Sequence, residues 1–182
     1  MCSSDLGELL VFVVDLYRNA FLRERAGVDL EPLERTTLFL QGVEDAVIAA
    51  QNVVVAAESL GLGTTYLGSI LTDVRSVIAA LGLPERTFPL LGLLVGHRAQ
   101  EPQYKPRLPR EVMSAVDRYP DPAEHVEALA AYDDTVRDYY DLRDANTRVD
   151  SFSQQMARAL GTGGASRIPL LEVLHEQRLC LS

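Results

Sequence analysis

The segment that most constrains the fold is a long stretch rich in Ala and Val, residues 33–60, which runs into Gly61-Leu62-Gly63. Its apolar residues recur at i, i+3 and i+4 spacing and therefore predict a helix, whose opposite side is scarcely more polar. At about 1.5 Å per residue such a helix would cross a whole domain, so we expect it to be buried and closely packed on several sides. Gly61 fits the left-handed position that follows a helix C-terminus.

Three apolar segments around this helix predict strands, and the mixture of strands and helices predicts an α+β fold. Residues 9–15 are β-branched and apolar on both faces, as expected of a central strand. Residues 64–70 are predicted to form a short strand after the turn, and residues 87–97 another that Pro89 and Gly92 interrupt. Helices are predicted over 73–81, 122–142, 151–160 and 168–179.

Two of these helices carry capping signals. Thr72 is placed to cap the helix that follows it, and Gly82 is placed to end that helix. Ser151 forms a capping-box pattern with Gln154, three positions on.

Gln51 and Glu58 interrupt the long apolar helix. Because buried polar groups need partners, we expect both to be structural, with a catalytic Glu58 as the alternative.

Composition limits the classes of function. A chain of 182 residues, 47% hydrophobic and 24% charged, is typical of one soluble globular domain, here residues 1–182. A formal charge of −9 gives no support for nucleic-acid binding, because the long-range field repels phosphate chains. The apolar runs 9–16 and 47–57 are too short or too interrupted to cross a bilayer, and no secretory signal is visible. Cys2 and Cys180 offer no disulfide framework, so the predicted compartment is the cytoplasm.

The first residues are unusual for the start of a domain. Met1 to Asp5 leads by Leu9 into a buried-strand pattern, without the turn or cap usually met there. The sequence CSSDL also resembles translated sequencing-adapter read-through. We therefore expect residues 1–5 to be non-native and the native N-terminus to be missing.

Several common site motifs do not occur. The three histidines, His97, His125 and His175, are far apart and have no metal-ligand spacing, so no metal site is predicted. The glycines that follow the long helix match neither the Rossmann nor the P-loop spacing, and no G-x-S-x-G elbow is present. The glycines at 161–164 are more typical of a linker than of a phosphate cradle.

One basic cluster stands out in this acidic chain. Lys105, Arg107 and Arg110 fall within seven residues, on a backbone stiffened by Pro106 and Pro109. Such spacing pre-orders two or three cations around one anion, and a guanidinium can bind phosphate oxygens bidentately. The cluster therefore indicates an anion site, with a solvated loop of incidental charges as the alternative.

Two further arginines, Arg143 and Arg148, lie at the end of a predicted helix. There they complement the helix dipole, and they could equally bind a second anion. Arg158, inside a later helix, is predicted to be a solvated helix charge.

Three segments, 49–70, 81–109 and 132–155, together closely resemble the bacterial oxygen-insensitive NADPH nitroreductases. These enzymes form the FMN-dependent flavin reductase branch of the nitroreductase family. The resemblance runs from about Leu6 to the C-terminus and is carried by the AQN…AAES-GLG…Y-x-G and KPRLP elements together. It implies a nitroreductase-type α+β fold: an antiparallel-dominated sheet around a long buried core helix, flanked by helices and completed by a homodimer.

The resemblance also assigns residues to FMN. The backbone from Tyr66 through Leu67 and Gly68 to Ser69 would lie against the isoalloxazine, with N–H groups facing the N5 and O4 side of the flavin. Gly68 would be glycine because a Cβ would push the ring away.

Other cationic positions are assigned in the same way. Lys105 and Arg107 match the residues that hold the FMN phosphate. Arg143, Arg148 and Arg167 match positions associated with NADPH or substrate binding.

The implied activity is a ping-pong reaction. NADPH reduces FMN and leaves, and a nitroaromatic, a quinone or free flavin then takes the reducing equivalents, so no catalytic side chain is predicted. Two departures from relatives are visible. The basic His-Arg-Ser-x-Arg segment that opens relatives is absent, and Leu71-Thr72 replaces a common Arg-Asn pair, which leaves the pyridine-nucleotide contacts there open. The alternatives are a non-catalytic dimeric or ligand-binding relic, and a reductase of free flavin that serves a partner oxygenase.

Overall fold

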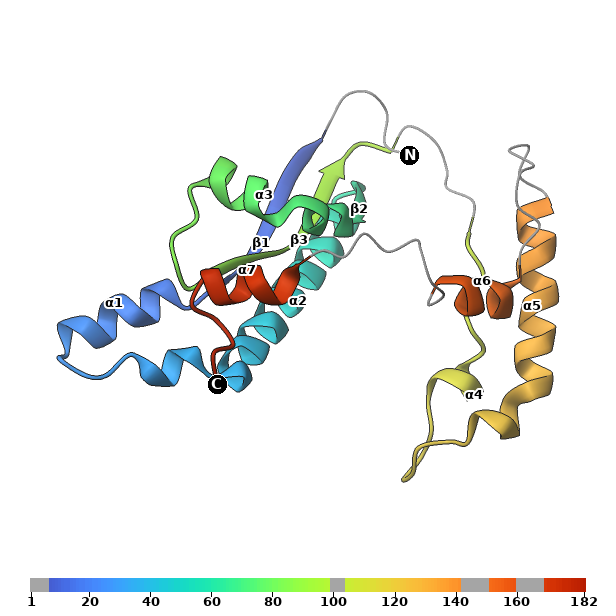
Figure 1. The fold of residues 1–182 in the computed structure, drawn as a ribbon. Helices are drawn as coiled ribbons and strands as arrows, with labels where there is room; N and C mark the ends of the chain where they lie inside the picture. The colour runs from blue at the N-terminus through green and yellow to red at the C-terminus, as the bar shows by residue number, and fades with distance from the viewer. Residues whose placement is uncertain (1–6, 99–103, 142–150, 160–168) are drawn as a thin grey trace. The chain divides into compact units, whose positions relative to one another are not determined.

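The computed structural model describes residues 7–98, 104–141, 151–159 and 169–182, which belong to two compact units (Figure 1). Unit 1 comprises residues 1–101 and 167–182, and unit 2 comprises residues 102–166. That the whole chain forms one domain stays a prediction.

Unit 1 is built on a three-stranded antiparallel sheet. Its strands are β1 (Glu8–Asp15), β2 (Gly63–Leu67) and β3 (Thr87–Gly96), in the order β1-β3-β2. The predicted α+β class, with an antiparallel sheet and a long helix, is confirmed. The prediction that the first strand is central is wrong for the described sheet, because β3 lies in the middle and β1 at the edge. Leu9 and Leu10 at the start of β1 are exposed, and an apolar sequence does not indicate which strands flank it.

Strand β3 carries a proline in the middle of the sheet. The register shifts between Phe12, which is paired with Leu91, and Val13, which is paired with Pro89. Leu90 is therefore the extra residue on β3. A bulge of this kind allows a proline in a central strand, because the ladder hydrogen bonds are already interrupted there.

The long helix is α2 (Thr36–Ser59), which follows the short 3₁₀-helix η1 (Glu31–Glu34). Its end is as predicted. Gly61 has a φ of +75°, its N–H donates to the Glu58 carbonyl over 3.0 Å, and the Leu62 N–H donates to the Ala57 carbonyl over 2.9 Å. These two bonds form a Schellman motif, which turns the chain sharply into β2.

Helix α2 packs against β1 through one side only. Its buried residues are Ala46, Ala50, Val54 and Ala57, whose small side chains allow a close approach to the sheet. Another side of the helix leaves Leu40, Val47, Ile48 and Val55 exposed. Among the described residues, α2 is the one helix long and apolar enough by length and composition to cross a membrane, a test that core helices of soluble proteins also pass.

Gly42 sets the distance between α2 and β1. A Cβ at this position would lie 2.6 Å from Cγ1 of Val14, which is 1% exposed. Gly42→Leu should therefore destabilise the protein by about 3 kcal/mol, more than the roughly 1 kcal/mol gained by replacing a helical glycine. Thermal unfolding followed by circular dichroism measures the change. Ala49→Leu, which enlarges an exposed position of the same helix, is the control and should barely change the melting temperature. An unaltered melting temperature for Gly42→Leu would contradict the close packing.

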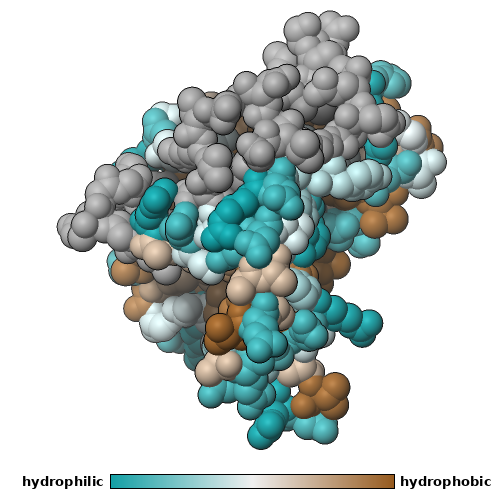
Figure 2. Space-filling model, turned by 90° about the vertical axis from the view of Figure 1, so that its right-hand side faces the viewer, coloured by the Kyte–Doolittle hydropathy of each residue, from teal (hydrophilic) through white to brown (hydrophobic). Residues whose placement is uncertain are grey.

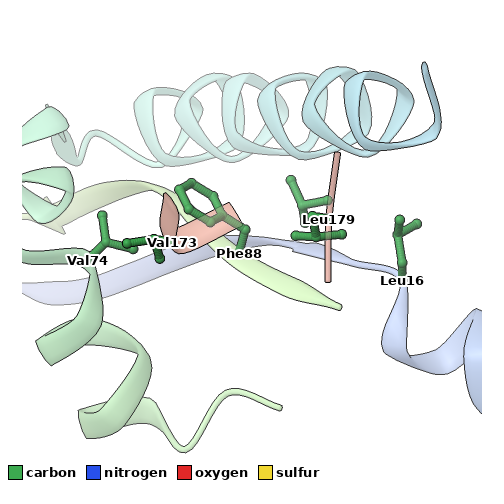
Figure 3. Packing of buried hydrophobic residues seen from close by; sticks show 6 residues of the cluster. Leu16, Val74, Phe88, Val173 and Leu179 are labelled. Atoms are coloured by element: carbon green, nitrogen blue, oxygen red, sulfur yellow. The ribbon is translucent and has the colours of Figure 1, made fainter. Parts of the chain in front are cut away.

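The core of unit 1 includes the C-terminal segment. Helix α7 (Leu170–Glu176) places Val173 in the core, and Leu179 follows it. Both pack with Leu16 and Phe88, and Figure 3 shows this cluster beside α2. The Glu34 side chain accepts a hydrogen bond from Arg178 over 2.6 Å, and this bond holds the pKa of Glu34 below its ordinary range. The C-terminal segment therefore packs against the chain at the start of α2.

Two α-helices and a 3₁₀-helix complete unit 1. Helix α1 (Tyr17–Arg25) follows β1 directly, and α3 (Val74–Leu81) follows the 3₁₀-helix η2 (Gly68–Asp73). The cap of α3 is Asp73 and not Thr72, because the Asp73 carboxylate accepts the Ser76 N–H over 3.2 Å. Gly82 ends α3 with a φ of +60°, as predicted.

Unit 2 is helical in its described residues. Its elements are α4 (Arg110–Met113), the 3₁₀-helix η3 (Pro122–His125), α5 (Val126–Asp141) and α6 (Phe152–Ala159). Figure 2 looks at the side on which Figure 1 draws α5, and hydrophilic surface predominates there among separate hydrophobic patches. Within unit 2, α5 buries Tyr132, Val136 and Tyr139 and leaves Glu127, Asp134 and Asp138 exposed, as an amphipathic helix does.

Candidate functional site

The first part of the predicted site is the junction of β2 and η2 in unit 1. Tyr66 and Leu67 end the strand, and Gly68 and Ser69 begin the 3₁₀-helix. Tyr66 is 46% exposed, and Gly68 and Ser69 are exposed as well. The backbone of this junction is therefore accessible to a ligand.

Two glycines near this junction differ in what surrounds them. A Cβ on Gly92 would lie 3.2 Å from the Ile70 side chain and 3.3 Å from the Leu67 Cβ, so Gly92 lets the junction pack onto β3. A Cβ on Gly68 would meet no heavy atom of the described residues within 4 Å. The φ of Gly68 is also not positive. Neither backbone conformation nor internal packing therefore requires a glycine at position 68.

Tyr66 is held by the long helix. Its hydroxyl donates a hydrogen bond to Oε1 of Gln51 over 3.3 Å. Gln51 and Glu58 are both exposed, so the expectation that they are buried is wrong, but Gln51 has a hydrogen-bond partner, as expected of a structural group. The periodicity of α2 did not predict the exposure of these two residues, because both sides of the helix are apolar and only one side packs on the sheet. The Gln51–Tyr66 contact itself had no signal in the sequence.

The second part of the predicted site is the basic segment of unit 2. Lys105 and Arg107 are exposed, and within the described residues neither forms an ion pair. Pro106 lies between them, and its carbonyl accepts a hydrogen bond from the Tyr132 hydroxyl over 3.1 Å. Tyr132 is 8% exposed, so this bond fixes the basic segment to the core of unit 2. The backbone that carries the two cations is thus held in place, and their exposed side chains are available to an anion.

A cavity of about 320 Å³ lies beside these cations. Residues of α4, α5 and α6 form its walls with the basic segment: Lys105, Pro106, Arg107, Leu108, Met113, Tyr132, Val136, Phe152, Gln155 and Met156. No carboxylate is among them. The sequence predicted the cations but not the cavity, since its walls come from segments about 50 residues apart.

The junction of α5 with α6 shapes this cavity. Asp133 accepts the Ser153 N–H over 2.9 Å, and the Ser151 hydroxyl accepts the Gln154 N–H over 3.2 Å, as the capping pattern predicted. Burial alone would raise the pKa of Asp133, but the hydrogen bonds from Ser153, together with Arg137 and Ser151, outweigh it and lower the pKa. The capped start of α6 brings Phe152 edge-on to Tyr132, with ring centroids 5.4 Å apart.

A larger cavity, of about 470 Å³, lies in unit 1 between β1, α1 and α2. Its polar lining has mixed charge: Asp15 and Arg18 pair over 2.7 Å, and Asp45 adds a second carboxylate. A site for a phosphate-bearing ligand is not indicated there, because its one cation already has a partner.

The remaining predicted residues, Arg143, Arg148 and Arg167, lie outside the described residues. The junction at Tyr66–Ser69 belongs to unit 1, and the Lys105–Arg107 segment belongs to unit 2. In the described part of the chain, no three His, Cys, Asp or Glu side chains come together as metal ligands.

Comparison with known families gives two matches along the chain. Residues 32–97 match the model of the nitroreductase family, and residues 105–182 match that of the nitroreductase family C-terminal domain. Among curated proteins, an NADPH-dependent oxidoreductase of Staphylococcus saprophyticus is 38% identical over 174 residues, which cover 93% of this chain and 68% of that protein. An NADPH-dependent oxidoreductase of Staphylococcus aureus strain MRSA252 is 37% identical over 95% of this chain and 70% of its own length.

Solved structures show the same similarity. The NfrA1 nitroreductase of Bacillus subtilis superposes with a TM-score of 0.90 at 34% identity, over 97% of this chain and 72% of that one. The NADPH:FMN oxidoreductase of Vibrio harveyi, complexed with NAD+, superposes with a TM-score of 0.82 at 33% identity, over 97% of this chain and 69% of that one.

Proposed function

Because this chain belongs to the nitroreductase family, we propose that it is an NADPH-dependent oxidoreductase that carries FMN. The nitroreductase-type fold expected from the sequence is confirmed by the superposition on NfrA1. The observation that carries the proposal is identity of more than a third with an NADPH-dependent oxidoreductase over nearly the whole chain. The V. harveyi structure, an NADPH:FMN oxidoreductase, supports FMN as the cofactor.

The residues present suit FMN. Gly68 has no internal reason to be a glycine, and its exposed backbone offers room for a flat ring to approach closely. Lys105 and Arg107 are unpaired within the described residues and are held by a stiff backbone, as a phosphate site requires. A planar ring and a phosphate are the two recognisable parts of FMN.

The proposed roles of this chain's residues are binding and orientation. Lys105 and Arg107 donate charge-assisted hydrogen bonds to the phosphate, and the backbone of Tyr66, Leu67, Gly68 and Ser69 positions the ring. When bound, FMN supplies the chemistry by accepting hydride from NADPH and passing reducing equivalents to the acceptor. No side chain of this site is proposed to act as an acid, a base or a nucleophile.

The nucleotide and the acceptor are proposed to use the same site in turn. Arg143, Arg148 and Arg167 are proposed to bind NADPH or substrate, since each is a cation suited to phosphate or carboxylate groups. The proposed acceptors are nitroaromatics, quinones and free flavins.

The visible absorption spectrum tests this function directly. The purified chain is incubated with FMN, desalted, and then mixed with NADPH under anaerobic conditions. We expect a retained flavin spectrum that bleaches when NADPH is added. A protein that stays colourless would contradict FMN binding by this chain and would favour the non-catalytic relic.

A soluble cytoplasmic homodimer is proposed as the working form. The exposed apolar side of α2 carries Leu40, Val47, Ile48 and Val55, and a second copy of the chain would remove it from water. The alternative cover is a lipid bilayer. Packing of the other side of α2 on the sheet favours the dimer, because a helix that packs on a sheet with one side cannot be surrounded by lipid as a membrane-spanning helix is.

Ile48→Glu combined with Val55→Glu should convert the dimer into a monomer. These residues are 61% and 59% exposed within one chain, and burying two unpaired carboxylates in an interface costs several kcal/mol each. Sedimentation velocity measures whether the protein is a dimer or a monomer. Ala49→Glu combined with Ala56→Glu adds the same two charges at exposed positions, each about 100° further round α2, and should leave the dimer intact. A dimer that survives the double substitution would place the interface elsewhere.

A further inference from the structure

Arg86 is a buried arginine of unit 1 that lies directly before β3 and is 6% exposed. Its backbone N–H donates to the Gln177 carbonyl over 2.7 Å, and its carbonyl accepts the Leu16 N–H over 2.9 Å. The φ of Arg86 is +66°, in the left-handed region that is uncommon outside glycine. Two segments distant in sequence thus fix this backbone, and the guanidinium is enclosed together with it.

One buried nitrogen of this guanidinium has no partner. Nη2 of Arg86 donates to Oε1 of Glu34 over 3.4 Å, which is long for a charge-assisted hydrogen bond. Nη1 is enclosed, and no acceptor among the described residues forms a hydrogen bond with it. An unsatisfied buried donor on a charged group costs free energy and is rare in folded proteins. Nη1 therefore calls for an acceptor that the described residues do not supply, either an ion or a water.

The charges around Nη1 favour an anion over a water. Arg178 donates to the same Oε1 of Glu34 over the shorter distance of 2.6 Å, so one carboxylate oxygen serves two guanidinium groups. Within the described part of the chain, Glu34 is the one carboxylate that forms an ion pair with either arginine, and the exposed Glu85 acts on Arg178 only from a longer distance. An arginine does not lose its proton, and a buried charge requires an opposite one. A water would accept the N–H but would leave the enclosed charge of Arg86 only partly balanced.

We propose that Nη1 of Arg86 is the donor of a buried site for a small monovalent inorganic anion such as chloride. The anion accepts a hydrogen bond from Nη1 and balances the positive charge that Glu34 leaves over. Because Nη1 is closed off from solvent, the site suits an ion close to a water molecule in size, and phosphates and organic carboxylates are excluded. The ion enters when unit 1 opens locally. None of the residues proposed to bind FMN takes part.

The anion stabilises the contact between the C-terminal segment and η1. The Glu34 carbonyl accepts the N–H groups of Leu181 and Ser182 over 2.8 and 3.2 Å, and its side chain accepts from Arg178. One glutamate therefore joins Arg86 to the end of the chain. A negative ion at Nη1 reduces the repulsion between the two guanidinium groups that share this glutamate. The stability of unit 1 should therefore depend on which anion is in solution.

Thermal unfolding of the full chain in two salts tests this site. Sodium chloride is exchanged for sodium gluconate at constant ionic strength, because gluconate is too large for the site and the screening of surface charges stays the same. The quantity measured is the melting temperature in chloride minus that in gluconate. With chloride at ten times its Kd or above, we expect this difference to be at least about 2 °C larger in the original protein than in Arg86→Met. Arg75→Met is the matched control: Glu172 and Glu176 already satisfy that guanidinium, so this variant should respond to chloride as the original protein does.

Bromide locates the ion without any substitution. Crystals of the original protein grown in sodium bromide should show an anomalous diffraction peak in contact with Nη1 of Arg86. The proposal is overturned if an ordered water occupies that place, if bromide is found on surface cations alone as an adventitious ion only, or if Arg86→Met responds to chloride as strongly as the original protein. The bromide experiment decides the question even where Arg86→Met fails to fold, because it needs no variant.

Discussion

Replacing Lys105 and Arg107 together with alanine is expected to weaken FMN binding by about a hundredfold or more. Each cation is proposed to donate charge-assisted hydrogen bonds to the phosphate, and such bonds contribute roughly 1.5–3 kcal/mol each. No other described cation lines the same opening to compensate. Flavin fluorescence quenching during titration of the protein into FMN measures the affinity.

Riboflavin and Arg110 supply the controls for this result. Riboflavin lacks the phosphate, so its affinity should be about the same for the original chain and the double variant. Arg110→Ala removes a cation from the same segment, at a position that does not line the cavity, and should change FMN affinity by no more than about twofold. Unchanged FMN affinity in the double variant would reject the phosphate assignment, and an equal loss of riboflavin binding would show that the substitution had damaged the unit instead.

Features with a local cause were predictable from the sequence. The turn at Gly61 was correct because a glycine directly after a helical pattern has few other uses, and the Schellman bonds are made within six residues. The start of α6 was correct for the same reason, since Ser151 caps a helix that begins one residue later. The cap of α3 was misplaced by one residue, because Thr72 and Asp73 are both good capping residues and only the backbone path decides between them.

Features that depend on distant partners were not predictable. The order of the strands follows from how β3 inserts between β1 and β2, and an apolar run carries no information about that order. The burial of Gln51 and Glu58 was misjudged because it depends on which side of α2 meets the sheet. The cations of unit 2 were found because they are adjacent in sequence, whereas the cavity beside them is assembled from three helices.

Gly68→Val is expected to abolish flavin binding while leaving the fold intact. A Cβ at this position would project into space that the described residues do not fill, and the backbone conformation is accessible to any residue, so the substitution should cost little stability. If the flavin ring lies against this backbone, the valine side chain occupies the place of the ring and excludes it. After incubation with FMN and desalting, the variant should be colourless and should show the far-ultraviolet circular dichroism of the original chain.

Gly92→Val provides the contrast that makes this result specific. A Cβ on Gly92 meets Leu67 and Ile70 at 3.2–3.3 Å, so valine there should force the junction off β3 and lower the melting temperature. Loss of flavin with a normal melting temperature in Gly68→Val, beside loss of stability in Gly92→Val, would separate a ligand contact from a packing contact. A Gly68→Val protein that remains yellow would show that the ring does not approach this backbone, and the flavin would then have to be sought at another surface of the chain.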